Sequence, residues 1–244
     1  KLAGVFTITM SENATNCHSK GGGRPRRCPR CSGRAAEEIV AEVNRAIEEG
    51  VHVASPGARV VVWTWAWPDA WSHRAIDLLP AGIEVMCVSE DHIPLKIGGI
   101  DVTLRDYSMS QVGPGERALG QWDRARRRGL KTVAKVQFNN TWECSAVPFI
   151  PTFQLVERHI CNLREAAVDG LLLSWTTGGY PSPNLELLSM STAELTAARY
   201  GTEIANDVVR ACQALSNSFA EFPFSIYVVY HGPQNYGPMN LLHA

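Results

Sequence analysis

The sequence lacks any apolar run that approaches the roughly 18 residues of a membrane-spanning helix, and no signal peptide opens it. It also lacks an excess of either charge, because 23 basic and 24 acidic residues leave a formal net charge of −1. A balance so close to neutral gives no general attraction to nucleic acid or to an anionic membrane. We therefore expect neither as a partner, while the oligomeric state stays open.

Cysteine is too sparse for the disulfide framework that holds many small secreted domains together. Seven cysteines in 244 residues leave at least one thiol unpaired. Four of them are scattered along the chain, and we expect these to be buried thiols: Cys87, Cys144, Cys161 and Cys212. This usage favours a reducing, cytoplasmic compartment. The chain also opens at Lys1 directly on a strand-like run, so we expect the natural polypeptide to be longer.

What is present is a regular alternation of strand-like and helical patterns. The helical segments repeat apolar residues every three to four positions, and the strand-like runs are continuous enough for buried parallel strands. Five strands are expected, at residues 2–10, 59–67, 83–89, 132–138 and 170–175. Helices are expected at 35–51, 68–79, 115–128 and 153–167, with one long or broken helix at 192–219. This order indicates an α/β fold with a parallel sheet built from βαβ units.

Acidic and aromatic residues fall where the expected strands end, namely Glu12, Trp67, Glu90, Glu143 and Trp175. A ring of such strand ends forms the mouth of a (β/α)8 barrel, the TIM barrel, where active sites lie. A barrel needs eight strands, so we predict that residues 1–221 are its C-terminal part. This part would hold about five βα units, with a Cys-rich loop at 14–34 after the first strand. Residues 222–244, rich in Pro, Gly and aromatics, would be a tail that begins a following segment.

Five short segments carry a family pattern: Thr9-Met10-Ser11-Glu12-Asn13, Cys28-Pro29-Arg30-Cys31, Trp63-Thr64-Trp65-Ala66-Trp67, Asn140-Thr141-Trp142-Glu143 and Ser174-Trp175-Thr176-Thr177-Gly178-Gly179-Tyr180. They resemble the catalytic domains of barrel-type glycoside hydrolases, especially uncharacterised bacterial relatives of β-N-acetylhexosaminidases. The resemblance covers most of the chain and is loose. The resemblance implies a retaining glycosidase with an acid/base Glu ending strand four and a nucleophilic Glu ending strand seven. With the strands here counted as the fourth to the eighth, those positions fall on Glu12 and Glu143.

Two alternatives stay open beside the retaining glycosidase. In hexosaminidases an Asp-Glu pair ends strand four, and the acetamido group of the substrate is the nucleophile. Here Ser11 precedes Glu12, so the residue that would orient the acetamido group is not an acid. The alternative from another class is a carbohydrate-binding barrel that is stapled by zinc and performs no catalysis.

The residue types themselves fit carbohydrate chemistry. Glycoside hydrolysis needs a proton donor and a second carboxylate, roughly 5–5.5 Å apart for retention and 6.5–9.5 Å for inversion, and it needs no cofactor. Glu12 could equally cap a loop, and Glu143 could lie in solvent. We expect contacts with the sugar substrate from Trp67, Glu90, Tyr107, Asn140, Trp142 and Trp175, although a Trp in a strand is more often part of the core.

Cys17, Cys28 and Cys31, with His18 beside the first of them, form the sharpest local pattern. A Cys-Pro-Arg-Cys knuckle can grip zinc through two thiolates, and Cys17 and His18 would complete a tetrahedral structural site. A disulfide and free thiols remain alternatives, since the second Cys-x-x-Cys of a zinc ribbon is absent. The arginines of this loop also raise nucleic-acid binding, but no aromatic residue interleaves them, so a solvated loop is the better interpretation.

Overall fold

The computed structural model describes residues 3–19, 28–144, 147–174, 181–224 and 229. Two compact units make up the chain, and each is described by itself. Unit 1 comprises Lys1–Cys87, Leu119–Ala134 and Val168–Gly170. Unit 2 comprises Val88–Ala118, Lys135–Ala167 and Leu171–Ala244.

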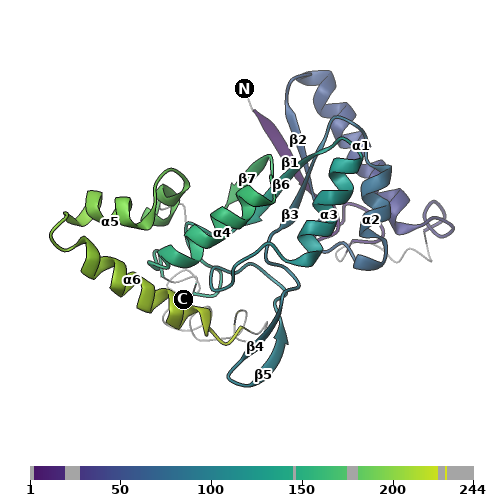
Figure 1. Ribbon diagram of the computed structural model, residues 1–244. Coiled ribbons are helices and arrows are strands. Elements are labelled where there is room, and N and C mark those ends of the chain that lie inside the picture. Colours follow the sequence, from purple (N-terminus) through teal and green to yellow (C-terminus); the bar gives the residue numbers. More distant parts are fainter. Residues whose placement is uncertain (1–2, 20–27, 145–146, 175–180, 225–228, 230–244) are drawn as a thin grey trace, which may run out of the picture. The chain divides into compact units, whose positions relative to one another are not determined.

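A five-stranded sheet has the order β1-β2-β3-β6-β7, so strands that follow one another in the chain are neighbours (Figure 1). Its members are β1 Gly4–Ile8, β2 Arg59–Trp63, β3 Glu84–Val88, β6 Lys131–Val136 and β7 Gly170–Leu173. Strand β2 pairs in parallel with both β1 and β3. All five expected strands are therefore present.

The prediction of a (β/α)8 barrel, complete or in part, is wrong. Among the described residues the sheet has five strands with β1 and β7 outermost, whereas the barrel closes eight. The other two strands, β4 Pro94–Ile97 and β5 Ile100–Thr103, form a separate antiparallel pair around Gly98 and Gly99. The prediction failed because an open sheet wound in chain order shows the same alternation of strands and helices as a barrel.

Unit 1 folds around the apolar faces of β2, β3 and three helices. Helices α1 Ala36–Ala54 and α2 Asp69–Leu78 pack against each other (Figure 1), and α3 Glu116–Arg127 lies mainly in the same unit. Every residue of β3 is buried, as expected of a central parallel strand. Trp122 of α3 is wholly buried, and its indole N–H donates to the carbonyl of Val133 at 3.2 Å, which fixes α3 on β6.

Unit 2 is mainly helical beyond the strand ends. Helix α4 Phe153–Glu165 packs against α6 Ala205–Ala220 and against the 3₁₀ helix η2 Pro183–Leu188. The segment 192–219, expected to form one long helix or a broken one, is broken into α5 Thr192–Tyr200 and α6, with Gly201 at φ 89° between them. The predicted tail at 222–244 falls mostly outside the described residues. Among the helices that the structure describes, none combines the length and apolarity that a membrane crossing requires.

Candidate functional site

Glu143 follows β6 and is completely buried. Its carboxylate accepts hydrogen bonds from the Ser108 hydroxyl at 2.8 Å, the Ser110 hydroxyl at 2.5 Å and the Thr141 hydroxyl at 2.7 Å. The backbone N–H groups of Met109 and Ser110 add two more, at 2.9 and 3.2 Å. These donors fix the carboxylate in one orientation and tie residues 108–110 to the end of β6.

Glu90, two residues beyond β3, is also completely buried. Its Oε1 accepts the backbone N–H of Ser108 at 2.9 Å, while its Oε2 has no hydrogen-bond partner within the described residues. Burial raises the pKa of Glu90 to about 8, against the lowering effect of the Lys135 charge and with a further rise from Glu143. Glu90 therefore keeps its proton at neutral pH, and it meets Glu143 at one shared residue, Ser108.

Lys135, the next-to-last residue of β6, is completely buried. Its Nζ donates to the side-chain oxygen of Gln137 at 2.9 Å and lies 3.8 Å from the centre of the Tyr107 ring. Burial lowers the pKa of Lys135 to about 7, although Glu90 and Asp106 act to raise it. The side-chain nitrogen of Gln137 is a second buried polar atom for which the described residues provide no partner.

Three of the expected substrate contacts lie in the same unit as Glu90 and Glu143. The rings of Tyr107 and Trp142 meet edge to face, with their centres 6.1 Å apart. Asn140 is 1% exposed, and its backbone N–H donates to the Ser174 hydroxyl at 3.4 Å. Unit 2 thus contains Glu90, Tyr107, Asn140, Trp142 and Glu143 from the predicted set.

The other predicted residues lie elsewhere. Glu12 belongs to unit 1, is exposed and accepts a hydrogen bond from the Ser11 hydroxyl. Trp67, also in unit 1, is 2% exposed and packs against Trp71 with ring centres 5.9 Å apart, as a core residue does. Trp175 lies outside the described residues. The pairing of Glu12 with Glu143 stays a prediction.

Sequence reasoning missed Lys135, Gln137 and the serines 108 and 110. A lysine and a glutamine at alternate positions of a buried strand and its continuation could have been noticed, because buried lysines are rare unless they have partners. The serines lie in an insertion without periodicity. Their role depends on hydrogen bonds to a residue more than 30 positions away, for which no local pattern exists.

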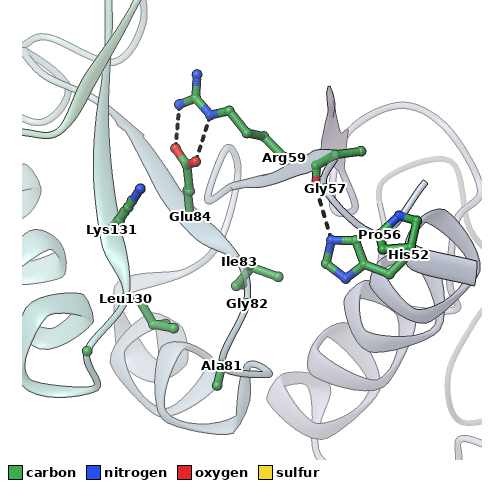
Figure 2. A pocket seen from close by; sticks show the side chains of 12 residues that line it. His52, Pro56, Gly57, Arg59, Ala81, Gly82, Ile83, Glu84, Leu130 and Lys131 are labelled. Carbon is green, nitrogen blue, oxygen red and sulfur yellow. Dashed lines mark hydrogen bonds and ion pairs between the residues drawn. The ribbon is translucent and has the colours of Figure 1, made fainter. Parts of the chain in front are cut away.

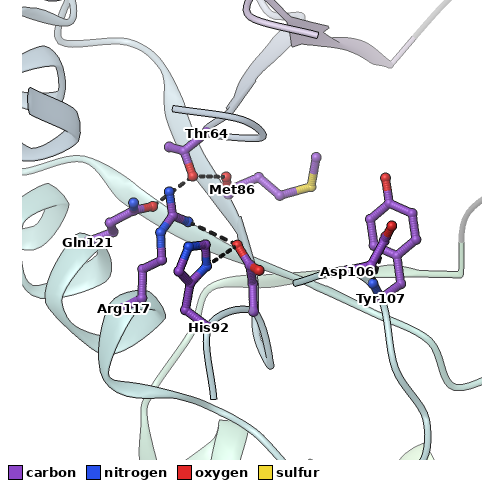
Figure 3. Close-up of polar contacts among 8 residues, drawn as sticks. Thr64, Met86, His92, Asp106, Tyr107, Arg117 and Gln121 are labelled. Carbon is purple, nitrogen blue, oxygen red and sulfur yellow. Dashed lines mark hydrogen bonds and ion pairs between the residues drawn. The ribbon is translucent and has the colours of Figure 1, made fainter. Parts of the chain in front are cut away.

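A second polar cluster follows β3 (Figure 3). Asp91 Oδ2 lies 2.9 Å from His92 Nδ1 and 3.4 Å from the guanidinium of Arg117, all within unit 2. His92 has a positive φ of 67°, which is uncommon for a residue other than glycine. In unit 1, Figure 3 also shows the Thr64 hydroxyl donating to the Gln121 side-chain oxygen at 2.7 Å.

The predicted cysteine cluster is confirmed as a group that could hold a metal ion. The sulfurs of Cys17, Cys28 and Cys31 all lie within 4.8 Å of one another, and His18 is not part of that group. The backbone N–H groups of Arg30 and Cys31 donate to the Cys28 sulfur and, with its two thiol neighbours, lower its pKa to about 7. Hydrogen bonds from Cys17 to the other two sulfurs raise the pKa of Cys17 to about 11.

A shallow pocket of about 420 Å³ lies in unit 1, at the amino ends of β2, β3 and β6 (Figure 2). Arg59 and Glu84 form a two-bond ion pair there, at 2.7 and 2.5 Å, and Lys131 lies on the same rim. His52 Nε2 is 3.0 Å from the carbonyl of Ala58. Arg59 and Glu84 thus pair with each other, and ligand sites of parallel sheets lie at the opposite, carboxyl ends.

The carboxyl ends of β3 and β6 therefore provide the best candidate site. A protonated acid, a fixed carboxylate and an amine of low pKa meet there, which is a set suited to acid–base chemistry. The chain matches no protein-family model and no curated protein. Function is inferred from the chemistry of this site.

Proposed function

We propose that the protein is a glycoside hydrolase in which Glu90 and Glu143 are the working carboxyl groups. The observation that carries this proposal is their junction at Ser108, where five donors fix the Glu143 carboxylate and complete burial raises the pKa of Glu90 to about 8. Glycoside hydrolysis requires this combination of a proton donor and a second carboxylate. Glu12, the acid expected from the sequence, is the competing proton donor.

The unpartnered atoms of the site support a sugar as the ligand. Glu90 Oε2 and the side-chain nitrogen of Gln137 are buried, and within the described residues neither has a partner. Buried polar atoms left without partners are costly, and each calls for an explanation. A sugar hydroxyl both donates and accepts, so hydroxyl groups can satisfy the two atoms. The half-buried Trp142 offers aromatic surface.

In the proposed reaction Glu90 gives its proton to the leaving oxygen as the glycosidic bond breaks. Glu143 stabilises the positive charge that develops at the anomeric carbon and, for retention, bonds to that carbon. Water then releases the sugar, and Glu90, now ionised, takes up the proton of that water. Lys135 lies beside Glu90 and shifts its protonation, without contact with the reacting atoms.

The hydrogen bonding of Glu143 favours one second candidate. Five donors reduce the capacity of a carboxylate to act as a nucleophile, and they are also what a purely structural carboxylate would have. On that interpretation the protein binds carbohydrate without cleaving it, and Glu143 only orders residues 108–110. Binding without turnover would identify this candidate.

The test is hydrolysis of a panel of aryl glycosides, including N-acetylglucosaminides, in which each sugar is compared with the same set of leaving groups. Glu90→Gln should reduce the rate by about 100- to 10,000-fold on a poor leaving group, and much less on 2,4-dinitrophenyl, which needs no proton. Glu143→Gln should reduce the rate on both. Glu12→Gln tests the competing proton donor, and the exposed Glu49→Gln of α1 is the control, with an expected rate equal to that of the wild type.

The alternatives give different results in the same panel. If Glu12→Gln shows the dependence on the leaving group and Glu90→Gln does not, Glu12 is the proton donor. Absence of turnover on every substrate by a folded wild-type protein would contradict the hydrolase. Circular dichroism and thermal melting establish that each variant is folded.

We propose Zn²⁺ as the ion at the cysteine cluster, in a structural role separate from catalysis. Thiolates select zinc over magnesium or calcium, which prefer oxygen ligands. The N–H groups that Arg30 and Cys31 direct at the Cys28 sulfur favour the thiolate, the form that binds metal. Elemental analysis should find one zinc per chain in the wild type and in Cys161→Ser, an exposed cysteine elsewhere, and none in Cys28→Ser.

A further inference from the structure

The cysteine cluster supplies three ligands, and structural zinc takes four. His18 follows Cys17 directly in the chain, so its imidazole is tethered next to a ligand. Its Nε2 is buried and has no hydrogen-bond partner among the described residues. A buried imidazole nitrogen without a partner is unfavourable, and binding of its lone pair to a metal would remove that cost.

The chain around His18 is fixed at the end of β1. The carbonyl of Thr9 accepts hydrogen bonds from the Thr15 hydroxyl at 2.7 Å and from the Asn16 side-chain nitrogen at 2.5 Å. The side-chain oxygen of Asn16 in turn accepts the backbone N–H of His18 at 2.8 Å. Ser19 adds a bond from its hydroxyl to the carbonyl of Asn16, at 2.8 Å. The backbone of residues 15–19 is therefore held in place by hydrogen bonds that do not involve the imidazole.

We infer that His18 is the fourth ligand of the ion, and that the ion clamps residues 11–19 to the carboxyl end of β1. The inference rests on the zinc assignment above and is independent of the hydrolase. Because His18 lies outside the group of sulfurs within 4.8 Å, a rotation of its side chain must accompany binding. The clamp spans Glu12, which lies between the anchors at Thr9 and Asn16. Ion binding thereby sets the position of this carboxylate.

Cobalt(II) substitution tests the ligand set directly, because the visible d–d bands report the number and kind of ligands. The probe is Co²⁺ added to the metal-free full chain, followed by competition with Zn²⁺. The wild type should show a four-coordinate spectrum with strong sulfur-to-cobalt charge transfer. His18→Ala should move the d–d bands to lower energy, since water is a weaker-field ligand than imidazole. It should also weaken Zn²⁺ binding by more than the 10- to 100-fold that changes of outer-shell partners cost.

Three further variants make the result decisive. His73→Ala, an exposed histidine in the same unit, and Cys161→Ser should leave spectrum and affinity unchanged. If His18→Ala fails to fold, His18→Cys provides the readout. A fourth thiolate there should restore binding and increase the charge-transfer absorption. A His18→Ala spectrum identical to that of the wild type overturns the inference, as does His18→Cys binding with no added charge transfer.

The outcomes also separate this inference from the proposals on which it stands. If His18→Ala retains one zinc per chain and its cobalt spectrum is unchanged, His18 is not a ligand and the site consists of the three cysteines. Absence of metal from the wild type under every loading condition removes the zinc assignment and His18 together. Neither result bears on hydrolysis by Glu90 and Glu143, which is measured on metal-free and metal-loaded protein alike.

Discussion

Glu90 and Glu143 accept hydrogen bonds from the same residue. The backbone N–H of Ser108 donates to Glu90 Oε1 at 2.9 Å, and its hydroxyl donates to Glu143 Oε1 at 2.8 Å. The two carboxyl groups come from the segments that follow β3 and β6, and the serine comes from the insertion between these strands. Ser108 therefore couples the orientation of one carboxyl group to that of the other.

Ser108→Ala should uncouple them, because it removes the hydroxyl donor to Glu143 and leaves the backbone N–H to Glu90. Loss of one bond to a buried carboxylate should lower the free energy of unfolding by about 1–3 kcal/mol. Urea unfolding measures this change, and the exposed Ser218→Ala is the control, with an expected change near zero. An equal change in both variants would show that the Ser108 hydroxyl contributes nothing particular.

Glu90 should make folding stability depend on pH in one direction. Its folded-state pKa, about 8, lies above the ordinary value of 4.5, so the folded protein binds the proton more tightly. The stabilisation is fully present below pH 4.5 and is lost as the pH rises towards 8. The difference in unfolding free energy between wild type and Glu90→Gln should therefore fall between pH 5 and 8. A difference that is flat or rises over this range would contradict the raised pKa.

Lys135→Met should move the alkaline limb of the hydrolysis profile to higher pH. The positive charge of Lys135 lowers the pKa of Glu90, so its removal lets that pKa rise further. Because the pKa of Lys135 is itself about 7, the lysine is only partly charged where Glu90 titrates, and the shift should be small. Glu90 must be protonated to act as an acid, and activity is lost as the pH rises through its pKa. The measurement is the pH dependence of kcat/KM, and the exposed Lys131→Met is the control. A shift to lower pH would exclude Lys135 as a group that tunes Glu90.

The sequence predicts the five strands of the sheet and the α-helices of this fold correctly, but it does not predict whether the sheet closes into a barrel. Continuous apolar runs identified β2 and β3, because buried parallel strands have apolar residues on both faces, and an alternating run of β-branched and apolar residues identified β6. The same runs could not distinguish an open sheet from a barrel, since closure depends on pairing between the first and last strands. Trp67 illustrates the corresponding limit for the site. Its place at a strand end suggested a sugar platform, yet its ring packs against Trp71.

Within the site, features that depend on neighbouring residues in the sequence could be predicted, whereas features that depend on contacts between distant residues could not. Glu90, as a substrate contact, and Glu143, as a catalytic residue, were identified because each lies in the segment that follows an expected strand. The raised pKa of Glu90 could not be foreseen, because it depends on complete burial and on the charge of Glu143, which is far away in the chain. The cysteine cluster was predictable for the opposite reason. A Cys-x-x-Cys knuckle is local, and its turn is closed by the Ser32 N–H bonding to the carbonyl of Cys28 at 2.9 Å.

The end of β3 beside Glu90 should be intolerant of added volume at Gly113. Ser89 Oγ and His159 Nε2 are hydrogen-bonded there at 2.7 Å, and both residues are buried. A Cβ at Gly113 would lie 2.5 Å from the Ser89 oxygen and 2.8 Å from the His159 nitrogen, closer than such atoms approach. Gly113→Ala should therefore break this bond or displace the 113–115 backbone.

Overpacking of this kind should lower the free energy of unfolding by about 1–3 kcal/mol. Gly57→Ala is the matched control, because a Cβ there meets nothing within 4 Å. Gly115, whose backbone N–H donates to the carbonyl of Ser89 at 2.8 Å, connects the same segment to the residue before Glu90. Hydrolysis by Gly113→Ala should accordingly fall together with stability. Full activity and wild-type stability in this variant would show that the backbone at the end of β3 moves to accommodate the added methyl group. Glu90 would then not be held as rigidly as its hydrogen bond to Ser108 implies.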